Sequence, residues 1–381
     1  MPFLWSTLLS VLPSLFVYAW AVRNFPAASR RPRRVVVALV ALVFARMIAR
    51  FVAIETHTRV AAAVHTVLST VAVTLAIASL PLGLLMAISW WLGRRVERSS
   101  PGPVAPGRRQ VLEAGGGVAL FGATGTMLGW GIVRGRHEFQ LTEVSVAIPG
   151  LPRALEGYVI AHVSDIHAGV FVDEGHLDAG LALVRSARPD LVAVTGDLVD
   201  DDIRFAPLVA RKLCALEPRD GIVGCLGNHD YYAGAQSVER VMKSAGIDLL
   251  VDEGRVIRGP DGGGFAVLGV DDLASRWYGR KGPQLERAMS TVAADLPRVL
   301  LSHQPVTVDR WAGRVALQLS GHTHGGQINP GSVLNPIFEY VAGSYRVRGT
   351  TLYVSRGFGT VGPPARVGAA PEVTRIVLRG A

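Results

Sequence analysis

The stretch YVIAHVSDIH, residues 158–167, is an apolar run that ends in an aspartate and a histidine. Its β-branched and aromatic residues predict a buried strand, so Asp165 and His167 are expected directly after the end of that strand. The same arrangement recurs along the chain: an apolar run of strand length, a small residue, and then carboxylate, imidazole or amide side chains. This recurrence predicts an α/β fold in which polar side chains gather at strand ends.

Residues 138–381 contain eight such runs, and helix-like stretches separate several of them. The runs predicted to be strands are 158–165, 190–197, 221–228, 265–272, 298–303, 315–322, 351–355 and 373–378. The stretches predicted to be helices are 173–187, 205–216, 235–245 and 283–294. Strands that alternate with helices in this way indicate an α/β domain with mixed sheets.

Five of the ten histidines fall at predicted strand ends, with glycine or serine nearby. The motifs are GDLVD (196–200), GNHD (227–230), LSHQ (301–304) and LSGHTHGGQ (319–327), in addition to the opening stretch. Strand ends at one edge of an α/β sheet are where such folds bind ligands. Each residue alone has a common structural explanation, such as a turn or a helix cap, but the ordered set points to a ligand site.

The residue types in these motifs favour a metal site. Carboxylate, imidazole and one amide, with no thiolate, suit Mn, Fe or Zn better than a soft metal. The seven candidate metal ligands are Asp165, His167, Asp197, Asn228, His303, His322 and His324. Seven ligands are enough for two divalent ions that share one carboxylate. The two cysteines, Cys214 and Cys225, form no CxxC motif, so a zinc–thiolate site is not supported.

The first third of the chain has a different composition. Hydrophobic residues make up 49% of the chain, which is high for a purely soluble protein. Four apolar segments lie near the N-terminus: Leu4–Val22, Val35–Ile54, Ala61–Leu92 and the weaker, glycine-rich Gly115–Val133. A spanning helix needs roughly 20 apolar residues. Residues 1–134 are therefore predicted to be a membrane region with about four transmembrane helices, which makes the chain a multi-pass protein of the cell membrane.

The excess of basic charge also belongs to this region. Residues 1–140 contain fifteen arginines and four glutamates, whereas residues 141–381 contain 24 basic and 26 acidic side chains. Such a bias is typical of cytoplasmic loops of membrane proteins. The C-terminal part shows no basic stripe with interleaved aromatic residues, so no nucleic-acid partner is expected.

The positions of the arginines predict an orientation. They cluster after the first and third apolar segments, which places those loops in the cytoplasm and residues 138–381 outside it; Arg134 and Arg136 argue mildly against this. Arg108 and Arg109 precede a glycine-rich stretch and resemble a twin-arginine export signal. Chance pairing of two arginines in an arginine-rich region is the alternative.

Taken in order, the motifs D-x-H, G-D-x-x-D, G-N-H-D, an isolated histidine and G-H-x-H resemble the calcineurin-like metallophosphoesterase superfamily. All five occur in order within residues 138–381. The similarity is greatest to bacterial membrane-associated or exported members, which the C-terminal stretches LYVSRGFGT (352–360) and PPARVGAAPEVTRIVL (363–378) also resemble. The resemblance implies a four-layer α/β/β/α sandwich, preceded here by the transmembrane helical region.

The resemblance also implies a role for each motif residue. One metal ion would be held by Asp165, His167 and His324, the other by Asn228, His303 and His322, with Asp197 bridging the two. In this family the two divalent ions activate a bridging hydroxide, which attacks phosphorus in line. His229 resembles the catalytic histidine that protonates or stabilises the leaving oxygen. Asp230 is expected to orient that imidazole, with a helix N-cap as an alternative or additional role.

Other residues are less specific. Asp200 stands where purple acid phosphatases have a tyrosine that binds ferric iron, so an Fe(III) site of that type is not expected. Arg356 and Arg366 are candidates for contact with a phosphate or for surface salt bridges. The aromatic and basic loop 271–282 is either a contact for substrate or lipid head groups or an ordinary surface loop.

These features predict a membrane-anchored dimetal phosphoesterase that hydrolyses a phosphodiester or pyrophosphate bond, with a lipid-linked or cell-envelope substrate. A UDP-diacylglucosamine-type pyrophosphatase is the sharpest version, although a phospholipid or wall-polymer phosphodiester fits the predicted orientation better. The alternative is a catalytically inactive membrane receptor or scaffold that uses the esterase fold. Such a protein would be expected to have lost ligands or the catalytic histidine, and the sequence retains them all.

Overall fold

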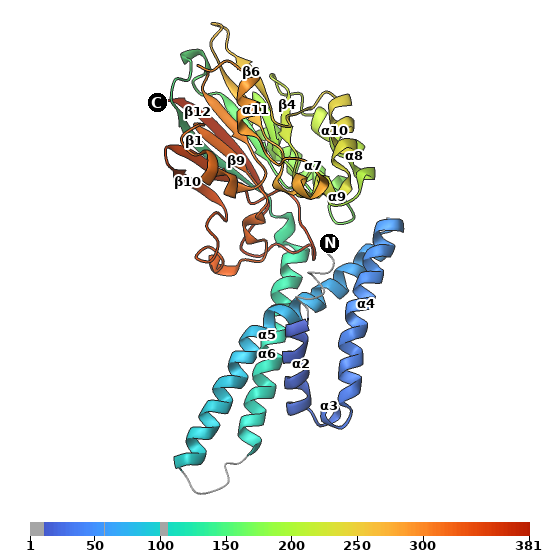
Figure 1. The fold of residues 1–381 in the computed structure, drawn as a ribbon. Helices are drawn as coiled ribbons and strands as arrows, with labels where there is room; N and C mark the ends of the chain where they lie inside the picture. The colour runs from blue at the N-terminus through green and yellow to red at the C-terminus, as the bar shows by residue number, and fades with distance from the viewer. Residues whose placement is uncertain (1–10, 57, 100–105) are drawn as a thin grey trace. The chain divides into compact units, whose positions relative to one another are not determined.

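The protein was analysed as a computed structural model, which describes residues 11–56, 58–99 and 106–381. The chain divides into two compact units, residues 1–132 and 133–381. The described part of the first unit is helical, whereas the second contains all the described strands (Figure 1).

The first unit is a set of apolar helices. They are α2 (Val11–Asn24), α3 (Pro26–Arg30), α4 (Pro32–Thr56), α5 (Arg59–Ser99) and α6 (Pro106–Val133). Among the described residues, three stretches are long and apolar enough to cross a membrane: Pro32–Thr56, Val60–Leu92 and Gln110–His137.

Two sequence predictions for this unit fall partly outside the described residues. Helix α2 is the described part of the first predicted segment, and residues 4–10 of that segment lie outside. Arg108 and Arg109 lie in the first turn of α6, but their side chains are outside the described part. The possible export signal therefore stays a prediction.

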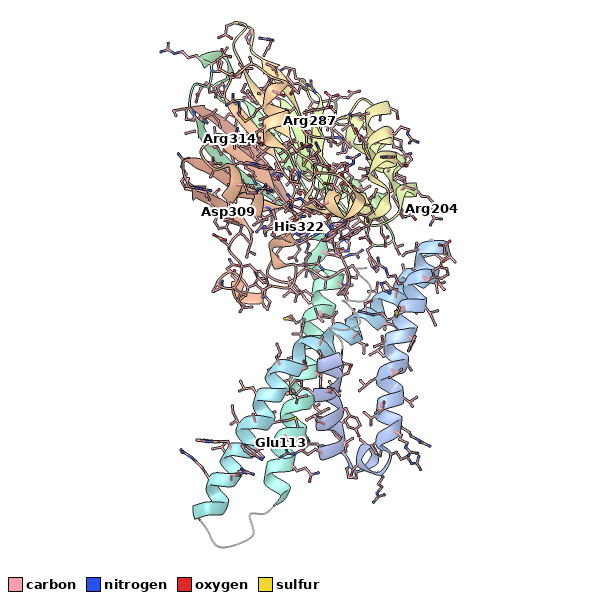
Figure 2. The ribbon with its side chains drawn as sticks, in the orientation of Figure 1. Glu113, Arg204, Arg287, Asp309, Arg314 and His322 are labelled. Atoms are coloured by element: carbon pink, nitrogen blue, oxygen red, sulfur yellow. The ribbon has the colours of Figure 1, made fainter. Side chains whose placement is uncertain are left out.

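A buried carboxylate ties three of these helices together. Glu113 of α6 is only 1% exposed, and Nε of Arg23 lies 2.9 Å from its Oε2 atom (Figure 2). Ser89 of α5 donates to the same carboxylate, and Nε1 of Trp20 donates to the main-chain oxygen of Glu113 at 2.9 Å. A carboxylate among apolar helices requires such partners, so this cluster fixes α2, α5 and α6 against one another.

The second unit contains two six-stranded sheets. The first has the order β1 (Gln140–Ile148), β12 (Glu372–Gly380), β2 (Val159–Val163), β3 (Leu191–Thr195), β4 (Ile222–Cys225) and β5 (Asp248–Leu249). The second has the order β10 (Gly343–Val347), β11 (Thr350–Val354), β9 (Leu317–Ser320), β8 (Arg298–Leu301), β7 (Gly264–Gly269) and β6 (Glu253–Arg258). Strands β2 to β5 run parallel, as do β7, β8, β9 and β11.

Alternation along the strands creates the layers. Ile160 of β2 faces a core that also contains Val267 and Leu319 of the other sheet, so the two sheets pack face to face. The next residue, Ala161, belongs to a separate core on the opposite face of the first sheet. That core is closed by α7 (Glu174–Ser186), α8 (Ala206–Cys214) and α10 (Ala235–Ser244).

The outer face of the second sheet has its own covering helices. Leu300 of β8 packs with Leu285 of α11 (Leu285–Ser290) and Trp311 of α12 (Val308–Trp311). The order of layers is therefore helix, sheet, sheet, helix, as the sequence resemblance implied. All eight predicted strands and four predicted helices are present. Strands β1, β5, β6 and β10 and the short helices α9 (Asn228–Ala233) and α12 were not predicted.

Candidate metal centre

Both sheets deliver polar side chains to one place. Asp165 and His167 follow β2, and Asp197 follows β3, whereas Asn228 begins α9 just after β4. His303 follows β8 and His322 follows β9, so the second sheet contributes from its own parallel strands. Because parallel strands end at the same sheet edge, these residues come together although they are up to 157 positions apart in the numbering.

The backbone at these positions is strained. Five of the seven candidate ligands have positive φ angles: Asp165 (54°), His167 (48°), Asp197 (52°), His322 (73°) and His324 (52°). Left-handed backbone is uncommon for residues with a Cβ atom, and such strain concentrates at functional sites. The sharp turns aim successive side chains inward at the points where the strands end.

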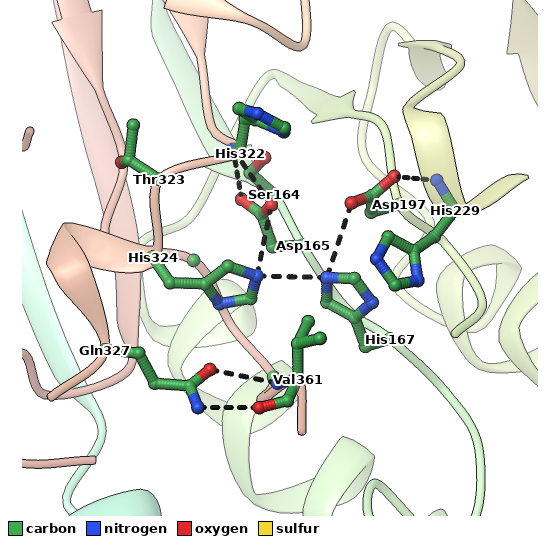
Figure 3. Close-up of polar contacts among 12 residues, drawn as sticks. Ser164, Asp165, His167, Asp197, His229, His322, Thr323, His324, Gln327 and Val361 are labelled. Atoms are coloured by element: carbon green, nitrogen blue, oxygen red, sulfur yellow. Dashed lines mark hydrogen bonds and ion pairs between the residues drawn. The ribbon is translucent and has the colours of Figure 1, made fainter. Parts of the chain in front are cut away.

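The first group of donors comprises Asp165, His167 and His324 (Figure 3). Nε2 of His167 lies 3.0 Å from Nε2 of His324, which lies 3.5 Å from Oδ1 of Asp165. All three residues are buried. Burial raises the pKa of the Asp165 carboxyl, because a carboxylate removed from water loses the hydration of its charge.

The second group of donors comprises Asn228, His303 and His322. Nε2 of His303 lies 3.1 Å from Oδ1 of Asn228 and 3.2 Å from Nδ1 of His322. Asn228 and His303 are buried, whereas His322 is the exposed member of the seven. His322 and His324, two positions apart, therefore face different neighbours; that they hold different metal ions stays a prediction from the family resemblance.

Asp197 lies between the two groups. Its Oδ2 atom is 3.4 Å from Nε2 of His167 and 3.2 Å from Nε2 of His303. Its Oδ1 atom accepts a hydrogen bond from the main-chain nitrogen of His229 at 2.8 Å, which fixes the rotation of the carboxylate. Ring nitrogens and carboxylate oxygens converging at such distances, without a thiolate, form a donor set that fits two divalent ions.

His229 is oriented by Asp200. Nδ1 of His229 lies 2.6 Å from the main-chain oxygen and 3.1 Å from Oδ1 of Asp200. Burial disfavours the charged imidazole, but the carboxylates of Asp197 and Asp200 outweigh it and raise the pKa of His229 to about 9. Burial also opposes ionisation of Asp200, yet His167 and His229 hold its pKa well below the usual range.

The expectation that Asp230 orients His229 is wrong. The carboxylate of Asp230 is fully buried and accepts hydrogen bonds from four main-chain nitrogens instead. These belong to Asp197 (2.9 Å), Leu198 (2.9 Å), Val199 (3.4 Å) and Gly227 (2.9 Å). Asp230 therefore holds the turn after β3 against the start of α9. It is the third residue of that helix and caps it by accepting from the nitrogen of Gly227, which is the N-cap residue in place of the predicted Asp230.

The two arginines of the C-terminal stretch make contacts within the protein. Arg366 is 1% exposed, and its guanidinium donates to main-chain oxygens of His324 (2.9 Å), Arg356 (2.6 Å) and Gly357 (3.1 Å). One of its terminal nitrogens also lies 3.1 Å from Nδ1 of His324. Arg356 pairs with the buried carboxylate of Glu372 at 3.3 Å. Arg366 thus fixes the turn that carries His324.

Glycine is required at two of the turns. A Cβ atom on Gly321 would collide with the side chains of Ser164 and Asp165. One on Gly227 would collide with Asp197. The glycines in the GNHD and GHTH motifs therefore allow the two sheets to bring their ligand turns together.

Comparisons with known proteins identify the family of the chain. A sequence model of the calcineurin-like phosphoesterase family matches residues 158–326. The chain is 32% identical over 271 residues to a "Transmembrane protein with metallophosphoesterase domain" of Danio rerio, with 68% of this chain and 61% of that protein covered. It is 30% identical over 283 residues to the uncharacterized metallophosphoesterase YkuE of Bacillus subtilis, with 71% of this chain and 97% of that protein covered.

Among solved structures, the NAD nucleotidase of Haemophilus influenzae aligns with a TM-score of 0.38 and 15% identity, over 53% of this chain and 50% of that one. The chain spans about 60% of the length of the transmembrane relatives from Danio rerio and Bos taurus. The names of these relatives and the three apolar helices support a membrane protein. The fold, the motifs and the family match together show that the chain belongs to the calcineurin-like metallophosphoesterases, a family of metal-dependent phosphoesterases.

Proposed function

We propose that the protein is a membrane-anchored dimetal phosphoesterase that hydrolyses a phosphodiester or pyrophosphate bond in a lipid-linked or cell-envelope substrate. The position of Asp197 carries this proposal. Its Oδ2 atom lies within 3.4 Å of both His167 Nε2 and His303 Nε2, so one carboxylate serves two groups of donors. Two ions that share a carboxylate form the arrangement used for in-line displacement at phosphorus.

Each group of donors would hold one divalent ion, with Asp197 common to both. Asp165, His167 and His324 form one set, and Asn228, His303 and His322 form the other. When bound, the ions would supply water activation near neutral pH and neutralise charge on the phosphoryl oxygens. The donor chemistry is compatible with Mn, Fe or Zn.

His229 is proposed to donate a proton or hydrogen bond to the leaving oxygen. Its Nδ1 atom is engaged by Asp200, so Nε2 is the ring nitrogen left for the substrate. The imidazole is partly exposed, unlike most of the ligand candidates around it. A positioned acid of this kind typically contributes 10²–10⁴-fold to the rate. Retention of His229 and of every ligand candidate favours an enzyme over an inactive scaffold.

The catalytic unit is proposed to be extracytoplasmic. The supporting observation is the clustering of arginines after the first and third apolar segments. Protease treatment of spheroplasts from a bacterial host, with an epitope tag fused after residue 381, tests this. Loss of the tag in intact spheroplasts supports the proposal, whereas a tag that is protected until the cells are lysed contradicts it.

The activity is tested with full-length protein in nanodiscs, supplied in turn with Mn, Zn, Fe and Mg. Bis-p-nitrophenyl phosphate reports diester hydrolysis, and p-nitrophenyl phosphate reports monoester hydrolysis. We expect diester hydrolysis by the wild type and a loss of at least 100-fold for His229→Ala with bound metal retained. Hydrolysis of no phosphodiester or pyrophosphate by the metal-loaded wild type would overturn the proposal.

A further inference from the structure

An apolar pocket adjoins the metal centre. It has a volume of about 520 Å³, and its wall includes His322 together with Val306, Leu334, Phe338 and Tyr340. The remainder of the wall comes from neighbouring residues in 305–341. This volume lies within the range of about 300–1,000 Å³ typical of small-molecule sites. We refer to it as the apolar pocket.

The apolar pocket has exposed hydrophobic walls. Val306 is 49% exposed and Phe338 is 57% exposed, and Ile337, beside the pocket on the same loop, is 70% exposed. A cluster of solvent-exposed apolar side chains marks a surface that binds a ligand, a protein or a membrane. Half of the large hydrophobic residues that are exposed in the second unit lie in residues 306–338. Two others, Trp277 and Tyr278, are adjacent to each other in the sequence.

The loop that forms the wall is held in place. Thr323 Oγ1 donates to the main-chain oxygen of Val341 at 2.6 Å, and the main-chain nitrogen of Leu334 donates to Oδ1 of Asn329 at 2.9 Å. The hydroxyl of Tyr340 donates to Asp309 at 2.7 Å. These three hydrogen bonds hold the loop in one conformation, in which Leu334 and Phe338 line the pocket. The pocket is therefore formed before a ligand binds.

The pocket and the metal centre share one residue. His322 faces His303 through Nδ1, at 3.2 Å, and also lines the apolar pocket (Figure 3 shows its position beside Thr323). A phosphoryl group held at the second group of donors would therefore have the mouth of the pocket beside it. A substituent on that phosphorus has a short path to the apolar wall.

The polar groups of the pocket argue for one class of substituent. Among the described lining residues, Glu339 is the one carboxylate, and it would repel a second phosphate. The side-chain hydroxyls of Thr323 and Tyr340 already donate within the protein. The wall therefore offers few groups for a sugar or a nucleobase and suits a hydrocarbon chain.

We propose that the apolar pocket binds the alkyl chain of a lipid-borne phosphoester while its phosphoryl group lies at the metal centre. This inference rests on the function proposed above and names the part of the substrate that the site selects. Burial of one methylene contributes about 0.8 kcal/mol, which corresponds to about fourfold in binding. Chain length should therefore control kcat/KM until the pocket is filled.

The test uses full-length protein in nanodiscs with alkyl p-nitrophenyl phosphate diesters from methyl to octyl, all below their critical micelle concentrations. We expect kcat/KM to rise about two- to fourfold per methylene and then to level off. Phe338→Asn should flatten this dependence, so that its kcat/KM ratio of octyl to methyl diester falls well below the wild-type ratio. Ile337→Asn is the matched control, because Ile337 is exposed on the same loop but does not line the pocket.

The outcomes separate this inference from the function on which it rests. Hydrolysis of the methyl diester with no dependence on chain length overturns the pocket inference and leaves the phosphoesterase proposal intact. Equal effects of Phe338→Asn and Ile337→Asn also overturn it, because they would indicate that the loop binds the membrane rather than the substrate. If no diester is hydrolysed, calorimetric binding of octyl phosphate against methyl phosphate in the presence of Mn decides the question: equal affinities overturn the inference.

Discussion

Asp200 holds His229 through two contacts, since both its main-chain oxygen and its carboxylate lie within 3.1 Å of Nδ1 of the imidazole. The aspartate next to the histidine in sequence, Asp230, turns instead to the main chain of the preceding turn. The two carboxylates therefore have separable effects, one on the rate and the other on stability.

Replacing Asp200 with asparagine should reduce kcat about 10- to 100-fold, as is usual when the partner that orients a catalytic group is altered. The main-chain contact to His229 remains, but the negative charge beside the imidazole is lost. Because Oδ1 of Asp200 also lies 3.6 Å from Nδ1 of His167, kcat is compared at saturating metal, and elemental analysis of the purified protein measures bound metal in both proteins. Full activity in Asp200→Asn would show that the orientation of His229 does not depend on this carboxylate.

Replacing Asp230 with alanine should destabilise the protein by about 2–3 kcal/mol, because four buried main-chain nitrogens lose their acceptor. Thermal denaturation of the metal-free variant measures this. Asp200→Asn serves as the comparison and should change the melting temperature much less. Equal melting temperatures for wild type and Asp230→Ala would contradict the role assigned to Asp230.

Replacing Arg366 with methionine should weaken metal binding about 10- to 100-fold, because the turn that carries His324 loses its buried support. Arg379→Met is the control, since Arg379 is an exposed arginine paired with an exposed glutamate. Exposed ion pairs contribute about 0–1 kcal/mol, so the control should bind metal normally. Isothermal titration with Mn measures both, and unchanged affinity in Arg366→Met would refute the positioning role.

His162 should make the second unit sensitive to acid. It is fully buried in β2, its Nε2 lies 2.8 Å from Thr195 Oγ1, and burial lowers its pKa to about 3. The folded protein therefore favours the neutral imidazole. The contribution of His162 to the free energy of unfolding is fully present above about pH 6.5, the pKa of histidine in the unfolded chain. Below that pH the stability falls by about 1.4 kcal/mol per pH unit until the folded pKa is reached.

Urea denaturation of the metal-free unit, residues 133–381, between pH 6.5 and 4.5 measures this effect. The variant His162→Gln should lose this contribution, so its stability should depend on pH less steeply by about that amount. The comparison cancels the contributions of the other titrating groups, which are common to both proteins. Parallel pH profiles for the two proteins would exclude His162 as the origin.

The strands that are buried and apolar could be predicted from the sequence. The strands that were missed have no strong apolar pattern of their own and are defined by the strands with which they pair. Strand β1 alternates between exposed and buried residues and pairs with β12 at the other end of the domain. Local composition does not encode such a distant pairing. Strand β5 is only two residues long, and β10 forms one edge of the second sheet, so neither carries a strong apolar pattern.

The same limit applies to the candidate site. The seven ligand candidates could be recognised because each follows a predicted strand, and strand ends meet at one sheet edge. The sequence suggested Asp230 as the partner of His229, but adjacent residues at the start of a helix point about 100° apart. His229 and Asp230 therefore face different directions. For Arg366 the available signal was a basic residue in the otherwise apolar stretch PPARVGAA, which fits a buried structural role.

The central claim is that one carboxylate is shared by two metal ions. Metal stoichiometry in wild type and Asp197→Asn, measured by elemental analysis after loading with Mn and removal of excess metal, tests it most directly. We expect two ions per chain in the wild type and a fall below one in the variant, with diester hydrolysis lost in parallel. Two tightly bound ions in Asp197→Asn, or one ion or none in the wild type, would contradict it.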